Sequence, residues 1–297
     1  MTLSTDTAAA PTTTDRRFGF TAEQLAEWPT VYRGDLLQGR AYVVSGGGSG
    51  IGRATAFLLT RLGAEVLICG RDEAKLRGVA DDVDRLVGRR PRLRALNIRE
   101  PEAVASAMGE AFDALGRVDG LVNSAGGQFP QYAIDMAPKG WNAVIDTNLS
   151  GTWWMMQAAA RQWRDRGQPG NIVNIVASFT RGLPQMAHTA AARAGVTFLS
   201  KTVAVEWAPL EIRVNCVAPG QMETEGLNQY PDTFRARLGR ASPMRRMGDA
   251  WDIAQAVVYL CSESGKFITG ELLHVDGGMQ MWGNSFPLGV PEHLKEA

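Results

Sequence analysis

The stretch Ser45-Gly46-Gly47-Gly48-Ser49-Gly50-Ile51-Gly52 lies between an apolar run, residues 41–45, and a segment, residues 50–62, whose apolar side chains repeat at helical spacing. Glycines at a strand-to-helix junction let the backbone turn sharply and approach a pyrophosphate, and the free N–H groups at the helix start bind its oxygens. The pattern therefore predicts a dinucleotide-binding turn. Its expected cofactor contacts are Ser45, Gly46, Gly48, Ser49, Gly50, Ile51 and Gly52.

The same alternation of short apolar runs and helical segments continues along the chain. The expected strands are residues 41–45, 65–70, 92–97, 120–123, 171–177, 213–217 and 272–275, and expected helices include 50–62, 189–207, 250–262 and segments from 72 and from 101. Runs that are apolar throughout are typical of strands buried on both faces. We expect one α/β domain, residues 36–297, with a doubly wound parallel sheet and helices on both faces. Residues 1–35 are expected to form an N-terminal extension that is partly disordered.

Composition excludes several classes of protein. Of the 297 residues, 45% are hydrophobic and 21% are charged, which is typical of a globular chain. The formal net charge of zero gives no basic surface for nucleic acid or an anionic membrane. Three cysteines and three histidines, widely scattered, predict neither a disulfide framework nor a metal site. No apolar run approaches the ~20 residues that span a bilayer, and the first 14 residues carry no secretory signal pattern, so we expect a cytoplasmic protein.

The end of the second expected strand indicates which dinucleotide binds. Many dinucleotide folds place an acidic residue there to hold the ribose 2′-OH, but this chain has Gly70 followed by Arg71. A guanidinium without a neighbouring carboxylate suits a 2′-phosphate, and Arg53 could reach the same group. The sequence therefore favours NADP(H), although two solvated surface arginines are the alternative interpretation.

Five motifs follow one another in order: residues 45–52, Asn123-Ser124-Ala125-Gly126, Asn148, Asn215 with Pro219-Gly220, and Val275-Asp276-Gly277-Gly278. The set resembles the short-chain dehydrogenase/reductase family over roughly residues 36–281. The resemblance implies a Rossmann-like fold with a seven-stranded parallel sheet, a nicotinamide cofactor and a homotetramer or homodimer. It also implies the further cofactor contacts Asn97, Ile98, Asn123, Ala125, Gly126, Pro219, Gly220, Met222 and Thr224.

Within that family, the chain is most similar to the trans-2-enoyl-CoA and 2,4-dienoyl-CoA reductases. The likeness rests on residues 126–129 (Gly-Gly-Gln-Phe), 139–141 (Lys-Gly-Trp) and 191–196 (Ala-Ala-Arg-Ala-Gly-Val). It implies an acyl thioester substrate and places Gln128 where these reductases carry an amide donor.

The chain departs from the family where most members carry a Tyr-x-x-x-Lys pair. Thr189 stands in place of the Tyr and Arg193 in place of the Lys, while Ser178 lies one residue from the usual Ser position. A Thr hydroxyl is too weak an acid to protonate an alkoxide, and an Arg cannot pass on a proton but can hold ribose hydroxyls. An enolate, formed when an activated C=C bond is reduced, needs positioned hydrogen-bond donors more than a strong acid.

The candidate catalytic residues are Gln128, Asn148, Ser178, Thr189 and Arg193, with Asn148 at the family's fourth catalytic position. The proton donor to the α-carbon stays open between Tyr132, Tyr230, His188 and water. An apolar lid between residues 220 and 243 is the preferred interpretation of that segment, with ordinary helix core as the alternative. The candidate substrate contacts are Phe129, Tyr132, Leu227 and Tyr230.

These observations favour an NADPH-dependent reductase of an activated C=C bond, in an enoyl thioester or an enone. A carbonyl reductase or alcohol dehydrogenase with a relocated proton donor is the second interpretation. A cofactor-binding sensor or assembly subunit without activity is the third, because of the residues at 189 and 193.

Overall fold

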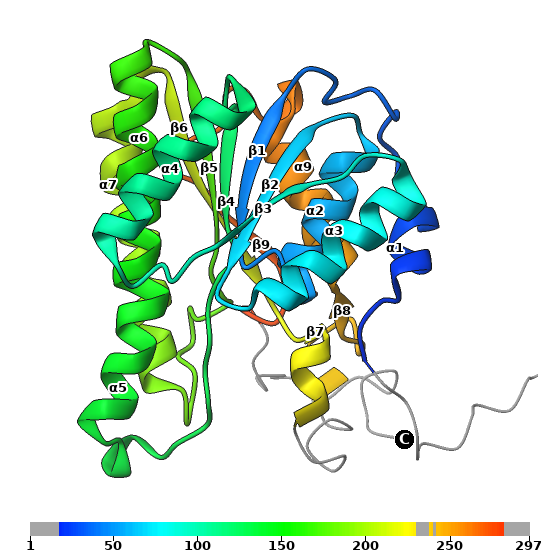
Figure 1. Ribbon diagram of the computed structural model, residues 1–297. Helices are drawn as coiled ribbons and strands as arrows, with labels where there is room; N and C mark the ends of the chain where they lie inside the picture. Colours follow the sequence, from blue (N-terminus) through cyan, green and yellow to red (C-terminus); the bar gives the residue numbers. More distant parts are fainter. Residues whose placement is uncertain (1–17, 230–237, 240–241, 282–297) are drawn as a thin grey trace, which may run out of the picture.

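The computed structural model describes residues 18–229, 238–239 and 242–281. Its central feature is a parallel seven-stranded sheet with the strand order β3-β2-β1-β4-β5-β6-β9 (Figure 1). The strands are β1 (Ala41–Ser45), β2 (Glu65–Gly70), β3 (Arg92–Ala95), β4 (Gly120–Asn123), β5 (Gly170–Ile175), β6 (Ile212–Pro219) and β9 (Leu272–Val275). A separate two-stranded pair consists of β7 (Met222–Glu223) and β8 (Gly248–Asp249). The predicted doubly wound α/β fold is confirmed.

Helices cover both faces of the sheet (Figure 1). One layer contains α2 (Gly50–Arg61), α3 (Glu73–Val87) and α9 (Ala250–Cys261), and α1 (Ala22–Glu27) packs on α2 and α3 from outside. The other layer contains α4 (Pro101–Leu115), α6 (Thr152–Arg166) and α7 (Ala187–Trp207), and α5 (Pro138–Ile145) packs against α7. Short helical turns are η1 (Ala133–Asp135), η2 (Asp146–Gly151), η3 (Ala208–Leu210), η4 (Glu225–Gln229) and η6 (Glu263–Gly265). No helix in the described ranges is long and apolar enough to cross a membrane.

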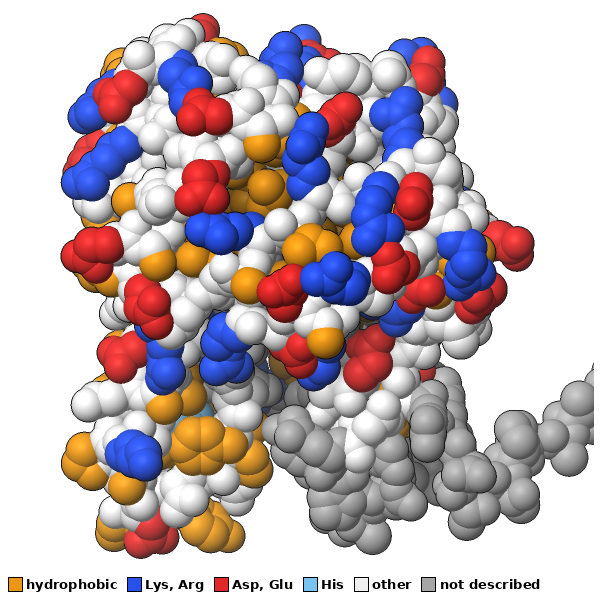
Figure 2. Space-filling model, in the orientation of Figure 1, with side chains coloured by type: hydrophobic (Ala, Val, Ile, Leu, Met, Phe, Trp, Pro, Cys, Tyr) orange, Lys and Arg blue, Asp and Glu red, His pale blue; other side chains and the backbone are white. Residues whose placement is uncertain are grey.

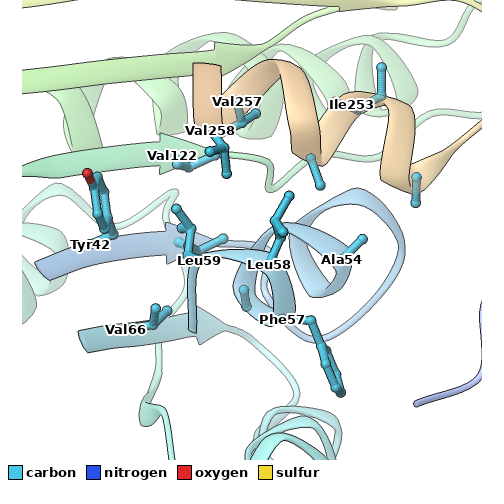
Figure 3. Packing of buried hydrophobic residues seen from close by; sticks show 14 of the residues in the cluster. Tyr42, Ala54, Phe57, Leu58, Leu59, Val66, Val122, Ile253, Val257 and Val258 are labelled. Carbon is cyan, nitrogen blue, oxygen red and sulfur yellow. The ribbon is translucent and has the colours of Figure 1, made fainter. Parts of the chain in front are cut away.

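The core beneath the cofactor turn is formed where α2 and α9 pack side by side on one face of the sheet (Figure 3). Leu58 and Leu59 of α2 and Val257 and Val258 of α9 are completely buried. Burial of four such side chains, at about 1.5–3 kcal/mol each, fixes α2 against the sheet. The N-terminal turn of α2 is thereby held at the carboxyl edge of the parallel strands, where ligands bind in folds of this class.

Strand limits differ slightly from the sequence-based expectation. β3 ends at Ala95 rather than residue 97, and β5 ends at Ile175 rather than residue 177. β3 pairs only with β2 and is largely exposed, because it lies at the edge of the sheet. Its Arg-Leu-Arg-Ala sequence suits a half-solvated edge strand better than a buried one.

Part of the N-terminal extension is folded onto the domain. Thr21 and Gln24 form a reciprocal capping box at the start of α1, and Leu25 is 2% exposed against the core. Further along, the Trp251 indole N–H donates to the Pro29 carbonyl at 2.9 Å, and the Tyr32 hydroxyl donates to the Gln255 carbonyl at 2.9 Å. The described part of the extension, from residue 18, therefore packs against α2, α3 and α9.

Candidate cofactor and active site

The glycine-rich turn owes its shape to two close backbone approaches. Gly46 has φ +74° and its N–H donates to the Cys69 carbonyl at 2.8 Å. A β-carbon on Gly46 would lie 2.6 Å from the Ala125 nitrogen, and one on Gly52 would overlap the Gly46 carbonyl. Only glycine fits at either position. The turn is thus packed flat against the loop after β4, and α2 begins at its end.

A cleft of about 900 Å³ opens at the carboxyl edge of the sheet, in front of this turn. Its walls include most of the predicted cofactor contacts: Gly46, Gly48, Ser49, Gly50, Ile51, Arg71, Asn97, Ile98, Ala125, Gly126, Arg193, Pro219, Gly220, Met222 and Thr224. Ser49 is the N-cap of α2, yet its side chain caps no backbone N–H, which leaves its hydroxyl for a ligand. These features fit a dinucleotide whose pyrophosphate lies at the start of α2.

Ser45, Gly52 and Asn123 do not line the cleft but form its support. The Ser45 hydroxyl lies 3.4 Å from Asn123 Oδ1, and the Asn123 amide donates to Asn174 Oδ1 at 2.8 Å. The Asn174 amide in turn donates to Ser200 Oγ at 2.9 Å. This buried chain of hydrogen bonds joins β1, β4, β5 and α7 behind the cleft, and the cofactor contacts of Ser45 and Asn123 stay predictions.

Arg53 also lies elsewhere than expected. Its guanidinium donates to the Phe20 carbonyl at 3.1 Å and pairs with Glu225 at 3.4 Å and Asp82 at 3.6 Å. It is not among the residues that line the cleft. The structure does not support the prediction that Arg53 meets a 2′-phosphate, because its guanidinium pairs with the carboxylates of Glu225 and Asp82.

The adenosine end of the cleft is positively charged. Arg71 lines it and makes no hydrogen bond or ion pair within the described part of the chain. Lys75, which the sequence analysis did not single out, lines it one helical turn further on. Asp72 caps α3 by accepting the Lys75 backbone N–H at 3.1 Å, and its other oxygen lies 3.8 Å from Lys75 Nζ. The Asp72 carboxylate thus interacts with Lys75, and the Arg71 guanidinium is available to a ligand.

At the opposite end, the loop after β4 is held by Asn148. The Gly127 N–H donates to Asn148 Oδ1 and the Asn148 amide donates to the Gly127 carbonyl, both at 3.0 Å. Asn148 can reach this loop because η2 is a π-helical turn between α5 and α6, a feature often found at functional sites. Gln128 follows directly, and its exposed side chain lines the cleft.

Arg193 reaches the same end of the cleft from α7. Its guanidinium packs on Gly126 and makes no hydrogen bond or ion pair with any residue of the described ranges. Burial lowers the pKa of Arg193 to about 10, so the side chain remains a cation at neutral pH. A cation without a protein partner, facing a cleft, fits contact with a bound ligand.

Thr189 does not reach the cleft. It is 1% exposed, and its hydroxyl lies 3.2 Å from Nδ1 of His188. The His188 ring packs edge-on against Phe129, at 4.7 Å between ring centroids, and burial lowers its pKa. Thr189, a candidate catalytic residue, therefore forms a buried pair with His188.

Ser178 is a second correction among the candidate catalytic residues. Its hydroxyl donates to Asp276 Oδ2 at 2.7 Å, and that carboxylate also accepts the N–H groups of Gly278 and Gln280. Ser178 is 4% exposed and lies outside the cleft, whereas Ala177 lines it. This hydroxyl stabilises the turn after β9 and is not available to a substrate.

The candidate substrate contacts are only partly brought together. Leu227 lines the cleft, whereas Phe129 and Tyr132 do not. Figure 2 shows hydrophobic side chains gathered at its lower left, over α5. Tyr132, Ile134 and Trp141 are 65%, 94% and 37% exposed. Tyr230 lies outside the described residues, as do residues 231–237 and 240–241 of the expected lid. Within the described ranges, no group of three residues could hold a metal ion.

Comparisons with known proteins agree with this geometry. Residues 46–280 match the family model described as enoyl-(acyl carrier protein) reductase. A Bacillus subtilis protein named "Probable 2,4-dienoyl-CoA reductase" is 35% identical over 84% of this chain and all of its own length. The peroxisomal 2,4-dienoyl-CoA reductase of Danio rerio is 33% identical over 87% of each chain. The solved structure of a citronellol catabolism dehydrogenase from Pseudomonas aeruginosa superimposes with a TM-score of 0.76, at 34% identity over 84% of this chain and 99% of its own. The chain belongs to the short-chain dehydrogenase/reductase family of oxidoreductases, whose members use NAD(P)H.

Proposed function

We propose that the protein is an NADPH-dependent reductase of a C=C bond conjugated to a carbonyl group, in an enoyl thioester or an enone. The observation that carries this proposal is the set of side chains at the catalytic end of the cleft. The amide of Gln128 and the guanidinium of Arg193 are hydrogen-bond donors among the side chains that line this end. None of the described residues that line the cleft is Tyr, His or Cys. The described lining of the cleft therefore offers donors for an oxyanion but no Tyr, His or Cys that could protonate an alkoxide.

The chemistry follows from these donors. The cofactor supplies a hydride for the β-carbon of the substrate. Negative charge then collects on the carbonyl oxygen as an enolate, which the Gln128 amide can stabilise by donating a hydrogen bond. A proton from water, added at the α-carbon, completes the reduction. Arg193 adds a fixed positive charge at the same end of the cleft. Because Asn148 holds Gly127 by two hydrogen bonds, the loop that carries Gln128 is preorganised for this role.

The preference for NADPH is supported at the adenosine end. β2 ends in Gly70 rather than in a carboxylate, and the guanidinium of Arg71 faces the cleft without a protein partner. Lys75 adds a second positive charge beside it. Two cations suit a 2′-phosphate and give little advantage to a ribose hydroxyl.

A homo-oligomer, tetramer or dimer, is part of the proposal. Phe198 and Val205 are 67% and 77% exposed on α7. They are seven residues apart and so lie on one face of the helix. An apolar stripe of this kind suits contact with a second copy of the chain.

The test is NADPH oxidation with three substrates: crotonyl-CoA, a cyclic enone and a saturated ketone. Turnover of either C=C substrate with the ketone inert supports the proposal. Turnover of the ketone alone supports the carbonyl reductase. Tight NADPH binding without turnover of any of the three substrates supports a protein that binds the cofactor without catalysis.

A further inference from the structure

Gln128 lies between two residues that other parts of the chain hold in place. On one side, Asn148 binds Gly127 by two hydrogen bonds of 3.0 Å. On the other side, the ring of Phe129 is in contact with both α5 and α7, two helices that pack against each other. The backbone of Gln128 is therefore fixed through both of its neighbours.

The contact of Phe129 with α5 depends on the glycine at position 140. A β-carbon on Gly140 would lie 2.9 Å from Cζ of Phe129, which is closer than packed carbon atoms approach each other. The Phe129 ring therefore lies directly on the backbone of α5. A residue larger than glycine at position 140 would push the ring away, and with it the loop that carries Gln128.

The contact of Phe129 with α7 is made by the imidazole of His188. The two rings meet edge to face, at 4.7 Å between centroids and 75° between planes, which is a favourable geometry for an aromatic pair. His188 is completely buried, and its Nδ1 accepts the Thr189 backbone N–H at 2.7 Å, so its ring has a fixed direction. Two residues beyond Phe129, the Gln131 N–H donates to the Gln185 carbonyl at 2.8 Å. The loop after β4 is thus attached to the start of α7 at two points.

We propose that Phe129 and His188 are positioning residues, which hold the Gln128 amide where the enolate oxygen develops. The proposal rests on the proposed function, in which Gln128 is the oxyanion donor. Such a donor is effective when it is already oriented before charge develops, which requires that its neighbours be locked by packing. Neither Phe129 nor His188 is among the residues that line the cleft, so both act through Gln128. The sequence predicts Phe129 as a substrate contact and leaves His188 open as a proton donor, and this proposal gives both residues another role.

A double-mutant cycle on the full-length protein tests the proposal, with whichever of crotonyl-CoA and the cyclic enone is reduced. Phe129→Ala should lower kcat by about tenfold to a hundredfold, because a displacement of about 1 Å near the reacting atoms can cost that much. KM for the substrate and KM for NADPH should change little. In the Gln128→Ala background, Phe129→Ala should change kcat by less than about twofold, because the group that it positions is already absent.

Changes on the two helices should show the same dependence on Gln128. Gly140→Ala acts from α5 and His188→Ala acts from α7, and each should lower kcat only while Gln128 is present. Gly78→Ala is the control for Gly140→Ala, because Gly78 lies within α3 and a β-carbon there meets nothing within 4 Å. It should leave kcat unchanged.

Two variants of the loop itself complete the set. Phe129→Leu keeps an apolar side chain against His188, so it should recover part of the kcat that Phe129→Ala loses. Ile134→Ala is the matched control, because it removes an apolar side chain from a 94% exposed position in the same connection between β4 and α5. It should change neither kcat nor KM.

Two results would overturn the positioning role while leaving the proposed function intact. Equal losses of kcat from Phe129→Ala with and without Gln128 would mean that Phe129 supports the fold in general. A change confined to KM for the substrate would return Phe129 to the role of a substrate contact. Failure of the proposed function looks different, because Gln128→Ala alone would then leave kcat unchanged, and the positioning role would fall with it.

Discussion

The guanidinium of Arg193 rests on the backbone of Gly126, so closely that a β-carbon at residue 126 would overlap Nη2. The same β-carbon would lie 3.1 Å from Oδ1 of Asn148. Three elements, α7, the loop after β4 and the π-helical turn, therefore share one packing point at the catalytic end of the cleft. A change at Gly126 must move a cation that faces the cofactor site.

Gly126→Ala should push the flexible end of Arg193 aside, and the loss of its charge-assisted contact with the cofactor should weaken NADPH binding by about tenfold. Calorimetric titration of NADPH measures this. Gly127→Ala is the matched control, because a β-carbon at residue 127 meets nothing within 4 Å. Equal affinities for the two variants would show that Arg193 can shift at no cost.

Gln128→Ala should lower kcat with a C=C substrate by ~10²–10³, the usual loss for one oxyanion donor. KM and NADPH affinity should stay nearly constant, because the interaction is stronger in the transition state than in the ground state. Gln128→Glu should be at least as harmful, since a carboxylate repels the enolate. Steady-state kinetics on both variants give the answer, and a change confined to KM would reduce Gln128 to a substrate-orienting residue.

Arg71→Ala should weaken NADPH binding by about tenfold to a hundredfold while leaving NADH affinity unchanged, because only the 2′-phosphate contact is lost. Binding of both cofactors is measured by fluorescence titration. Arg77→Ala serves as control, since Arg77 pairs with Glu73 on the surface of α3 and does not line the cleft. Equal affinity of the wild-type protein for the two cofactors would contradict the NADP assignment.

Thr189→Ala should leave reduction largely intact, because the buried Thr189 hydroxyl lies beside His188 and does not reach the cleft. Arg193→Ala should instead raise KM for NADPH, since a cation facing the cofactor site is lost. Steady-state kinetics with NADPH as the varied substrate distinguish the two variants, because only Arg193→Ala should change KM for NADPH. A thousandfold fall in kcat for Thr189→Ala, with unchanged NADPH binding, would reverse these roles.

Acid should destabilise the protein through His188. Burial lowers the pKa of this side chain below its ordinary value of about 6.5, so the unfolded chain takes up the proton first as the pH falls. The contribution to stability is complete above that pH and is lost progressively below it, down to the pKa of the folded state. Urea unfolding between about pH 7.5 and 5 should show a shallower pH dependence for His188→Gln than for the wild type. Parallel curves would contradict this account.

The sequence was sufficient for the fold and for most of the cofactor cleft, because both depend on local patterns. Glycines at a strand-to-helix junction place residues 46–51 at the start of α2 wherever the βα unit forms. Apolar runs give the seven strands, although the edge strand β3 carries too little apolar sequence to mark where it ends. The identity of the adenosine-end residue Arg71 followed from its place at the end of β2.

The misplaced residues are those whose partners lie far away along the chain. Ser178 bonds to Asp276 and Arg53 bonds to Glu225, and no local spacing reveals either pair. The clamp of Asn148 on Gly127 depends on a π-helical turn, which has no reliable sequence pattern. Lys75 could have been found, since it follows the predicted start of α3 by one turn and so faces the same cleft as Arg71.

The docked N-terminal extension also sets an order of events during synthesis. Pro29 accepts its hydrogen bond from Trp251, and these residues are 222 positions apart. At ~5–20 residues per second, a ribosome needs roughly 10–45 s to make the chain between them. Residues 18–32 can therefore meet α2 and α3 early in synthesis, through Arg53, Arg61 and Arg85, but they meet α9 only late. A nascent chain that stops before residue 250 has the glycine-rich turn and the first of these contacts, while Pro29 and Tyr32 still lack theirs.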